Sequence, residues 1–271
     1  MYTLSSEKKL AIVSFLLEGN SVRSTERITG AHRDTICRLL VQVGDHCTEL
    51  LDAQMRNLRC NYIQCDEIWT YVGKKQKRVR DGDPPEAGDQ WVFVAIDPES
   101  KLIPVHTVGK RTEETTWYFM QELAGRLATR VQLTTDGFHF YRRQVEDAFG
   151  EDVDFAQLIK LYGDFGQHDA DGKYSPSPIV EVISKVRQGN PDPEHICTSH
   201  VERQNLTMRM AMRRFTRLTN AFSKKLTNLK AACALHFAHY NFVRVHSSLR
   251  VTPAMAAGIA SEVWSLAQLL P

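Results

Sequence analysis

The spacing of apolar positions divides the chain into a helical beginning and a longer α/β region. Near the N-terminus, Leu10, Val13 and Leu17 recur at helical spacing. A second short helix is expected over 22–28, and a third begins near His32. Glycine-containing turns separate the three. We therefore expect a small all-α domain over the first ~58 residues.

The second and third of these helices have the pattern of a helix-turn-helix, in which a short helix and a tight turn precede a helix with a polar first turn. On this interpretation the third helix enters the major groove of DNA. Its candidate DNA-binding residues are Arg33, Thr35 and Arg38. The alternative is a plain three-helix bundle that makes no contact with DNA.

Beyond residue 58 the pattern changes to short runs of β formers that alternate with helical spacing. The sequence predicts strands over 62–72, 91–96, 103–108, 131–135 and 155–161, and helices over 112–127 and 141–149. This order matches an RNase H-like domain, an α/β fold with a mixed sheet and flanking helices, which we assign to residues 59–250.

The second half of the chain is harder to assign. Glycine and proline interrupt residues 163–199, so we expect an irregular insertion with one short element near 179–186. Helical spacing returns from residue 200 to 242, broken once near 219–222. A final helix is expected over 253–269, within a C-terminal segment 251–271.

Composition and charge narrow the class of protein. No apolar run is long enough for a membrane span, no secretory signal is evident, and the six cysteines show no framework spacing, all of which favour a cytoplasmic protein. The net charge is only +2, but residues 200–250 hold ten basic and one acidic side chains, and residues 61–199 are net −7. Such a distribution suits a protein that holds phosphates in one part and divalent cations in another.

Asp66 is the first candidate metal ligand, because it lies within an apolar strand. A charge there costs several kcal/mol unless it is paired or bound to a cation. Strand alternation places Asp66 and Glu67 on opposite faces, so only one of them should point into a shared site. The alternative is a strand carboxylate that pairs with a basic neighbour.

Asp136 is the second candidate. It follows the predicted strand 131–135 directly, and the carboxyl ends of strands are where α/β sheets place their chemistry. The alternative is a turn aspartate, since Asp-Gly is a favoured turn pair and Gly137 comes next.

Glu202 is the third candidate, as the sole acid of the basic stretch 200–250. Helical periodicity places Asn205, Arg209 and Arg213 on the same face as Glu202. An acid, an amide and two guanidinium groups along one stripe would bind a cation and follow a DNA backbone. The alternative is a helix on which Glu202 forms an ordinary salt bridge.

Other candidates carry weaker signals. Asp97 ends a predicted strand, but the following residues favour a hairpin turn. His200 could contact a phosphate or simply begin the helix. A zinc site of His195, Cys197 and His200 lacks a fourth ligand at suitable spacing.

Three segments resemble the insertion-sequence transposases of the IS-one type, members of the DDE superfamily. They are Cys65-Asp66-Glu67-Ile68-Trp69-Thr70-Tyr71-Val72-Gly73, Thr135-Asp136-Gly137-Phe138 and His200-Val201-Glu202-Arg203-Gln204-Asn205-Leu206-Thr207-Met208-Arg209. The resemblance covers roughly residues 60–245. It implies that Asp66, Asp136 and Glu202 are the catalytic, metal-binding triad of an RNase H-like core.

The function that this resemblance implies is cleavage at transposon ends followed by joining of the 3′-OH to target DNA, with two Mg²⁺ ions that Mn²⁺ could replace. The expected partners are terminal inverted repeats and target DNA, bound by a homodimer or larger assembly associated with the nucleoid. Arg209, Arg213 and Arg214 would hold phosphates. A nuclease of the same fold without strand transfer, or an inactive DNA-binding regulator, are the alternatives.

Overall fold

A six-stranded mixed sheet forms the centre of the molecule. The computed structural model describes residues 4–163, 178–216 and 219–271. The strands, in chain order, are β1 Tyr62–Val72, β2 Gly88–Ile96, β3 His106–Gly109, β4 Val131–Thr135, β5 Val153–Tyr162 and β6 Ile179–Gln188. Their order across the sheet is β3-β2-β1-β4-β5-β6. β4 and β5 continue parallel to β1, whereas β2, β3 and β6 are antiparallel to their neighbours.

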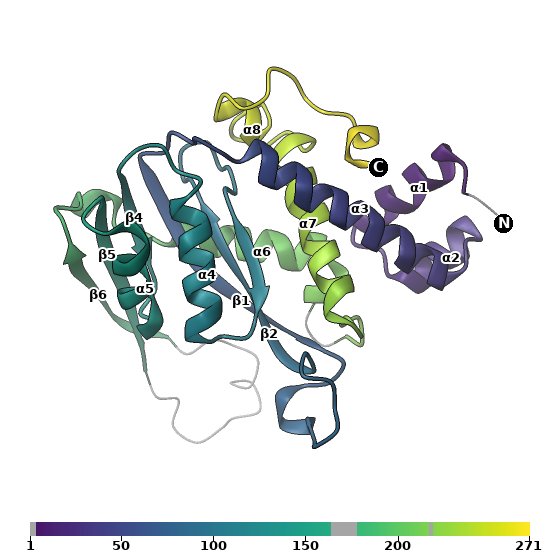
Figure 1. The fold of residues 1–271 in the computed structure, drawn as a ribbon, viewed down its shortest axis with the longest axis horizontal. Coiled ribbons are helices and arrows are strands. Elements are labelled where there is room, and N and C mark those ends of the chain that lie inside the picture. Colours follow the sequence, from purple (N-terminus) through teal and green to yellow (C-terminus); the bar gives the residue numbers. More distant parts are fainter. Residues whose placement is uncertain (1–3, 164–177, 217–218) are drawn as a thin grey trace.

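Helices cover both faces of this sheet, and further helices lie beside it. The helices are α1 Ser6–Leu17, α2 Val22–Thr29, α3 Arg33–Gln54, α4 Glu113–Ala124, α5 His139–Phe149, α6 Ser199–Ala211, α7 Leu226–Phe242 and the short α8 Pro253–Ala256. Figure 1 shows α4 and α5 on one face of the sheet, α6 on the other, and the α1–α3 region beside α7. The predicted fold class, a mixed α/β sheet with flanking helices behind a small helical region, is confirmed.

The helix ends lie close to where the sequence predicts them, because local capping groups fix them. The side chains of Ser5, Ser21 and Thr112 accept backbone N–H groups at the starts of α1, α2 and α4. Gly30 ends α2 in the left-handed region, with φ of 68°. The break predicted in the basic stretch is also present, between the end of α6 at Ala211 and the start of α7.

The helical region shares its core with the sheet. α3 packs along α7, and buried side chains of α3 such as Ile36 and Val43 join one continuous cluster with Ile63 of β1. The contact between the two helices is close at Gly44, where a Cβ would lie 2.4 Å from both Cα and Cβ of Ala231. The α3–α7 contact therefore depends on a glycine.

We expect Gly44→Ala to destabilise the protein by about 1–3 kcal/mol, because overpacking at a rigid helix contact outweighs the gain in helix propensity. Urea unfolding followed by circular dichroism measures the change. Gly125→Ala is a matched control, since Gly125 has ordinary helical φ and its added Cβ would meet only two backbone oxygens, at 3.4 and 3.9 Å. Equal stability of the two variants would contradict the close packing.

The predicted C-terminal helix over 253–269 was wrong. α8 ends at Ala256, and Gly258 adopts φ of 72° while the N–H groups of Gly258 and Ile259 bond back to Met255 and Ala254. This arrangement terminates a helix. The chain then turns back so that Trp264 stacks on Phe242 with ring centroids 4.3 Å apart.

The region predicted as an irregular insertion, 163–199, contributes a regular strand. The short element expected near 179–186 is β6, which pairs antiparallel with β5 and forms an edge of the sheet. Residues 164–177 of this prediction lie outside the described part of the chain. Among the described residues, no helix is both long and apolar enough to span a membrane.

Candidate active site

Two strands place Asp66 and Asp136 side by side. β4 runs parallel to β1 with Thr135 paired to Cys65, so Asp66 and Asp136 come next on adjacent strands. β4 ends at Thr135, and this leaves open the space beside β1 from Asp66 onward. One carboxylate oxygen each of Asp66, Glu67 and Asp136 lies within 4.8 Å of the others.

Helix α6 brings the third predicted acid to the same place. The side-chain oxygen of Gln64 on β1 accepts the backbone N–H groups of His200 and Val201, at 3.0 and 3.3 Å. The first turn of α6 is thus attached to the strand that carries Asp66. Asn205, one turn further, donates its Nδ2 to Oδ2 of Asp66 at 2.8 Å.

Glu202 stands at the rim of this group. It receives a hydrogen bond from Thr198 Oγ1 at 2.6 Å and forms an ion pair with Lys160 of β5. Its side chain is 45% exposed, and its negative charge raises the pKa of both Asp66 and Asp136. The structure therefore brings Asp66 and Asp136 into one close group with Glu67, and places Glu202 of α6 outside that group, at its rim.

Glu67 also belongs to the site, although strand alternation led us to expect only one of the two adjacent acids there. Its side chain is 1% exposed and accepts a hydrogen bond from Arg111 at 3.1 Å, while Arg111 lies 3.7 Å from Asp136. β2 flanks β1 on one side of Glu67, but β4 ends opposite Cys65, so the other side of β1 is open there. Glu67 lies next to Tyr141 of α5. The only sequence signal was a second acid in an apolar strand.

Burial and mutual repulsion disfavour simultaneous ionisation of the carboxyl groups in the site. Burial raises the pKa of Asp66 to about 7, and the charge of Asp136 acts in the same direction. Burial likewise raises the pKa of Glu67 to about 8 and raises the pKa of Asp136. Neighbouring carboxylates in a low-dielectric site disfavour one another's charged forms. A divalent cation would relieve this repulsion.

The donor atoms fit a hard divalent cation such as Mg²⁺. All the candidate ligands are carboxylate oxygens, the type that Mg²⁺ prefers. Oε1 of Glu67 and the hydroxyl of Tyr141 are both buried, and the two side chains are neighbours, but neither atom forms a hydrogen bond of normal geometry within the described residues. A buried, unsatisfied carboxylate oxygen is costly unless something binds it, and a cation would do so.

The weaker candidates lie elsewhere. Asp97 accepts hydrogen bonds from the backbone of Glu99 at 2.9 Å and from Ser100, as a turn aspartate does. Nδ1 of His195 lies 2.8 Å from Asp192 and Nδ1 of His200 lies 3.2 Å from Lys101. Within the described chain, the histidines and Cys197 belong to no group that could hold a metal ion.

The residues predicted to bind DNA fall into two sets. The first set lies at or near the surface: Arg33, Arg38 and Arg213 are exposed, and Thr35 and Arg209 are half-buried. Within it, the guanidinium group of Arg38 donates a hydrogen bond to the hydroxyl of Thr35 at 3.3 Å. Asn205 is buried and directed at Asp66, and the Nε of half-buried Arg214 donates to Ser223 at 2.9 Å. Of the polar stripe predicted on one helix, Asn205 points towards Asp66. The prediction was wrong for Arg213, because α6 ends at Ala211 and Arg213 begins a separate 3-10 helix.

Asn205→Ala should weaken Mg²⁺ binding about tenfold or more, because groups that orient a metal ligand commonly contribute this much. Thermal stability measured over a Mg²⁺ titration gives the affinity. Leu206→Ala, an exposed neighbour on α6, is the control and should bind Mg²⁺ as the wild type does. An unchanged affinity in Asn205→Ala would show that the amide does not position Asp66.

Comparisons with known proteins find only low similarity. No family model matches the sequence, and no curated protein does. A structure of the piggyBac transposase synaptic complex with hairpin DNA has a TM-score of 0.42 and 10% identity, over 99% of this chain and 71% of that chain. The Mos1 transposase paired-end complex with the left transposon end has a TM-score of 0.20 and 12% identity, over 56% of this chain and 60% of that chain. At these values the function has to be inferred from the carboxylate site itself.

Proposed function

We propose that the protein is a DDE-type DNA transposase of the insertion-sequence kind, which cleaves transposon ends and joins the freed 3′-OH to target DNA. The observation that carries this proposal is the gathering of Asp66, Asp136 and Glu202 from two adjacent strands and a helix. Hydrolysis and joining are both attacks of an oxygen on a phosphodiester, so one acidic site can perform both.

In this proposal, Asp66, Asp136 and Glu202 hold two Mg²⁺ ions, which Mn²⁺ can replace. The ions, when bound, activate the attacking oxygen and stabilise the leaving oxygen. Asn205 orients Asp66 through its 2.8 Å hydrogen bond, and Gln64 holds the start of α6 against β1. Glu67 adds a fourth carboxylate, fixed by Arg111.

Lys160 neutralises Glu202 in the structure described here. Its ion pair joins β5 to α6 across the rim of the acidic group. When cations bind, Glu202 has to exchange this partner, and the released ammonium group of Lys160 then lies at the rim of the site, where it could contact a DNA phosphate. This exchange would couple binding of the cations to binding of the strand.

DNA binding is assigned to two surfaces. The first turns of α3, with exposed Arg33 and Arg38, would contact the terminal repeats as a helix-turn-helix does. The stretch 200–250, net +9, would follow the backbone of the strand that is cut. Since two ends must be processed together, we also propose a homodimer or larger assembly on DNA.

A strand-transfer assay tests the proposal. The wild type is incubated with DNA that carries the terminal repeats of its element and with a target plasmid. Mg²⁺ is added at about 5 to 10 mM, a concentration chosen to saturate the metal site. We expect nicked ends and joined product, both abolished by EDTA. Cleaved ends without joined product would favour a nuclease, and binding to DNA without either product would favour a regulator.

A further inference from the structure

A pocket on the side of α6 away from Asp66 is lined by basic and aromatic side chains that the proposed chemistry does not use. It lies where α6, α7 and the end of α1 meet, and its volume is about 480 Å³. Gly19, just after α1, packs against the carbonyl of Ala211 at the end of α6. This volume is in the range of sites for small organic ligands.

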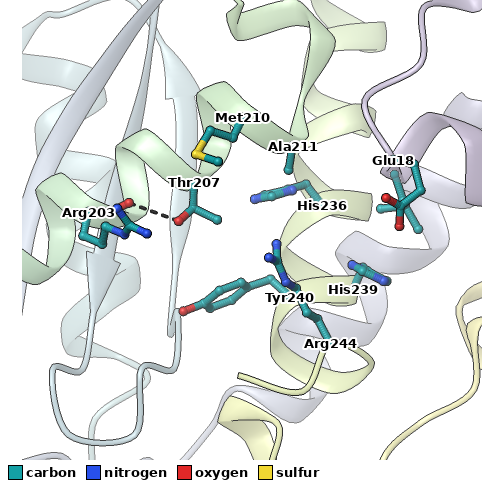
Figure 2. Close-up of a pocket in the computed structure, with 10 residues that line it drawn as sticks. Glu18, Arg203, Thr207, Met210, Ala211, His236, His239, Tyr240 and Arg244 are labelled. Carbon is teal, nitrogen blue, oxygen red and sulfur yellow. Dashed lines mark hydrogen bonds between the residues drawn. The ribbon is translucent and has the colours of Figure 1, made fainter. Parts of the chain in front are cut away.

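The polar groups of this pocket are suited to an anion. Arg203 of α6 and Arg244, just after α7, both line it and are exposed, and neither forms an ion pair within 4.0 Å with any residue that the structure describes. Figure 2 shows Arg244 beside His236 and Tyr240. Two guanidinium groups without acidic partners are a favourable site for a phosphate.

His236 supplies an independent indication of a ligand. Its side chain is 4% exposed and lines the pocket, and its Nε2 has no hydrogen-bond partner among the described residues. Burial lowers the pKa of His236 to about 3, so the ring is neutral at physiological pH. A buried ring nitrogen without a partner is costly, and a ligand oxygen or a water in the pocket would satisfy it.

The remaining walls favour a ligand larger than a phosphate. Tyr240 and His239 add aromatic rings along α7, and Met210, 72% exposed, adds an apolar side chain at the α6 wall. Glu18 supplies an acidic group on the side of His239. Aromatic and apolar surfaces next to two arginines can hold the base and the phosphate of a nucleotide together.

Helix α6 separates the pocket from the acidic site. A helix rotates about 100° per residue, so Arg203 and Thr207 each leave α6 about 160° from Asn205, on nearly the opposite side. Arg203 and Thr207 face the pocket, whereas Asn205 faces Asp66. A nucleotide in the pocket would therefore lie on the side of α6 away from the acids, against Arg203 and Arg244 of the basic stretch 200–250.

We propose that this pocket binds a nucleotide through its phosphate and base, and that in the working protein this nucleotide belongs to a DNA strand bound along the basic stretch 200–250. The assignment to DNA rests on the proposed function, whereas the nucleotide chemistry rests on the pocket alone. Arg203 and Arg244 hold the phosphate, His236 contacts an oxygen of the ligand, and Tyr240 lies against the base.

Binding measured without cleavage tests this proposal. Fluorescence anisotropy in EDTA gives the affinity of a labelled single-stranded oligonucleotide for the wild type, Arg203→Ala and Arg244→Ala. The control is Lys77→Ala, an exposed cation that lies outside the stretch 200–250 and does not line the pocket. We expect the two arginine variants to bind about tenfold more weakly than the control at equal salt, since a charge-assisted contact is worth about 1.5–3 kcal/mol.

Competition separates the two possible sources of the nucleotide. Deoxyadenosine monophosphate should displace the oligonucleotide from the wild type, whereas adenosine, which has no phosphate, should not. If the arginine variants bind the oligonucleotide and the monophosphate as the control does, the pocket is not a nucleotide site and the proposal is overturned. Arginine variants that lose only the monophosphate would overturn the assignment to a DNA strand and show a site for free nucleotides.

The same variants distinguish failure of this inference from failure of the proposed function. Glu114→Gln, an exposed residue of α4 outside both the pocket and the group of acids, should retain the wild-type affinity for the oligonucleotide within about twofold. If the wild type shows no Mg²⁺-dependent cleavage while the arginine variants still lose binding, the proposed function fails and the nucleotide pocket stands. If cleavage occurs and the arginine variants bind normally, the pocket assignment fails alone.

Discussion

Asp66→Asn should abolish both end cleavage and strand transfer, with a loss of at least about 10³-fold in rate. The asparagine keeps the size of the side chain but removes the charge that a divalent cation needs at the centre of the group of acids. Rates of nicking and joining on terminal-repeat DNA measure the loss.

The control for this prediction is Glu114→Gln, which makes the same change of charge on an exposed residue of α4, outside the group of acids. Glu202→Gln should lose activity as Asp66→Asn does, and the double variant should lose little more, because residues that act as one unit are not additive. Retention of more than about a tenth of the wild-type rate by Asp66→Asn would contradict its role.

The stability of the metal-free protein should fall as the pH rises from about 4 to 8. The folded protein binds more protons than the unfolded chain in this window, because the pKa of Asp66 is raised to about 7 and that of Glu67 to about 8. Stability decreases with pH wherever the folded state holds the extra protons. The stabilising contribution of the protonated acids is complete below pH 4 and is lost as the pH passes 7 to 8.

At pH 8, both the Asp66→Asn substitution and the addition of Mg²⁺ should raise the stability relative to the metal-free wild type. Metal-free Asp66→Asn should be more stable than the wild type by about 2–4 kcal/mol, since a pKa shift of one unit corresponds to about 1.4 kcal/mol. Mg²⁺ at about a hundred times its Kd should stabilise the wild type by about 2.7 kcal/mol and the variant much less. Urea unfolding with EDTA and with Mg²⁺, at pH 6 and pH 8, gives these values.

Glu114→Gln serves as the control here too and should unfold as the wild type does at both pH values. Two results would contradict a cation site built from carboxyls that are hard to ionise. One is an equal gain of wild-type stability from Mg²⁺ at pH 6 and at pH 8. The other is an Asp66→Asn protein that gains as much stability from Mg²⁺ as the wild type does.

The sequence was a good guide wherever a local signal decides the structure. β1 spans 62–72 as its alternating β formers predict, and Asp136 follows β4 as the end of an apolar run indicates. Serine and threonine caps fix the starts of the helices within a residue or two. These features depend on side chains close to one another in the chain.

Features that depend on distant parts of the chain were missed. Glu67 enters the site because β4 stops opposite Cys65, and no local pattern of β1 reveals where another strand ends. The 253–269 segment has helical periodicity, yet Gly258 and the stacking of Trp264 on Phe242 turn the chain back. The burial of Asn205 against Asp66 likewise needs α6 and β1 to be placed together.

The most direct test of the central claim is the position of Mn²⁺ in crystals of the protein, located by anomalous scattering. The carboxylate site predicts a peak about 2.0–2.4 Å from oxygens of Asp66 and Asp136, with Glu202 turned from Lys160 towards the ion or a second one. Crystals of Asp66→Asn should lose this peak. Mn²⁺ that binds away from these acids in the wild type, or leaves the site empty at saturating concentration, would contradict the claim.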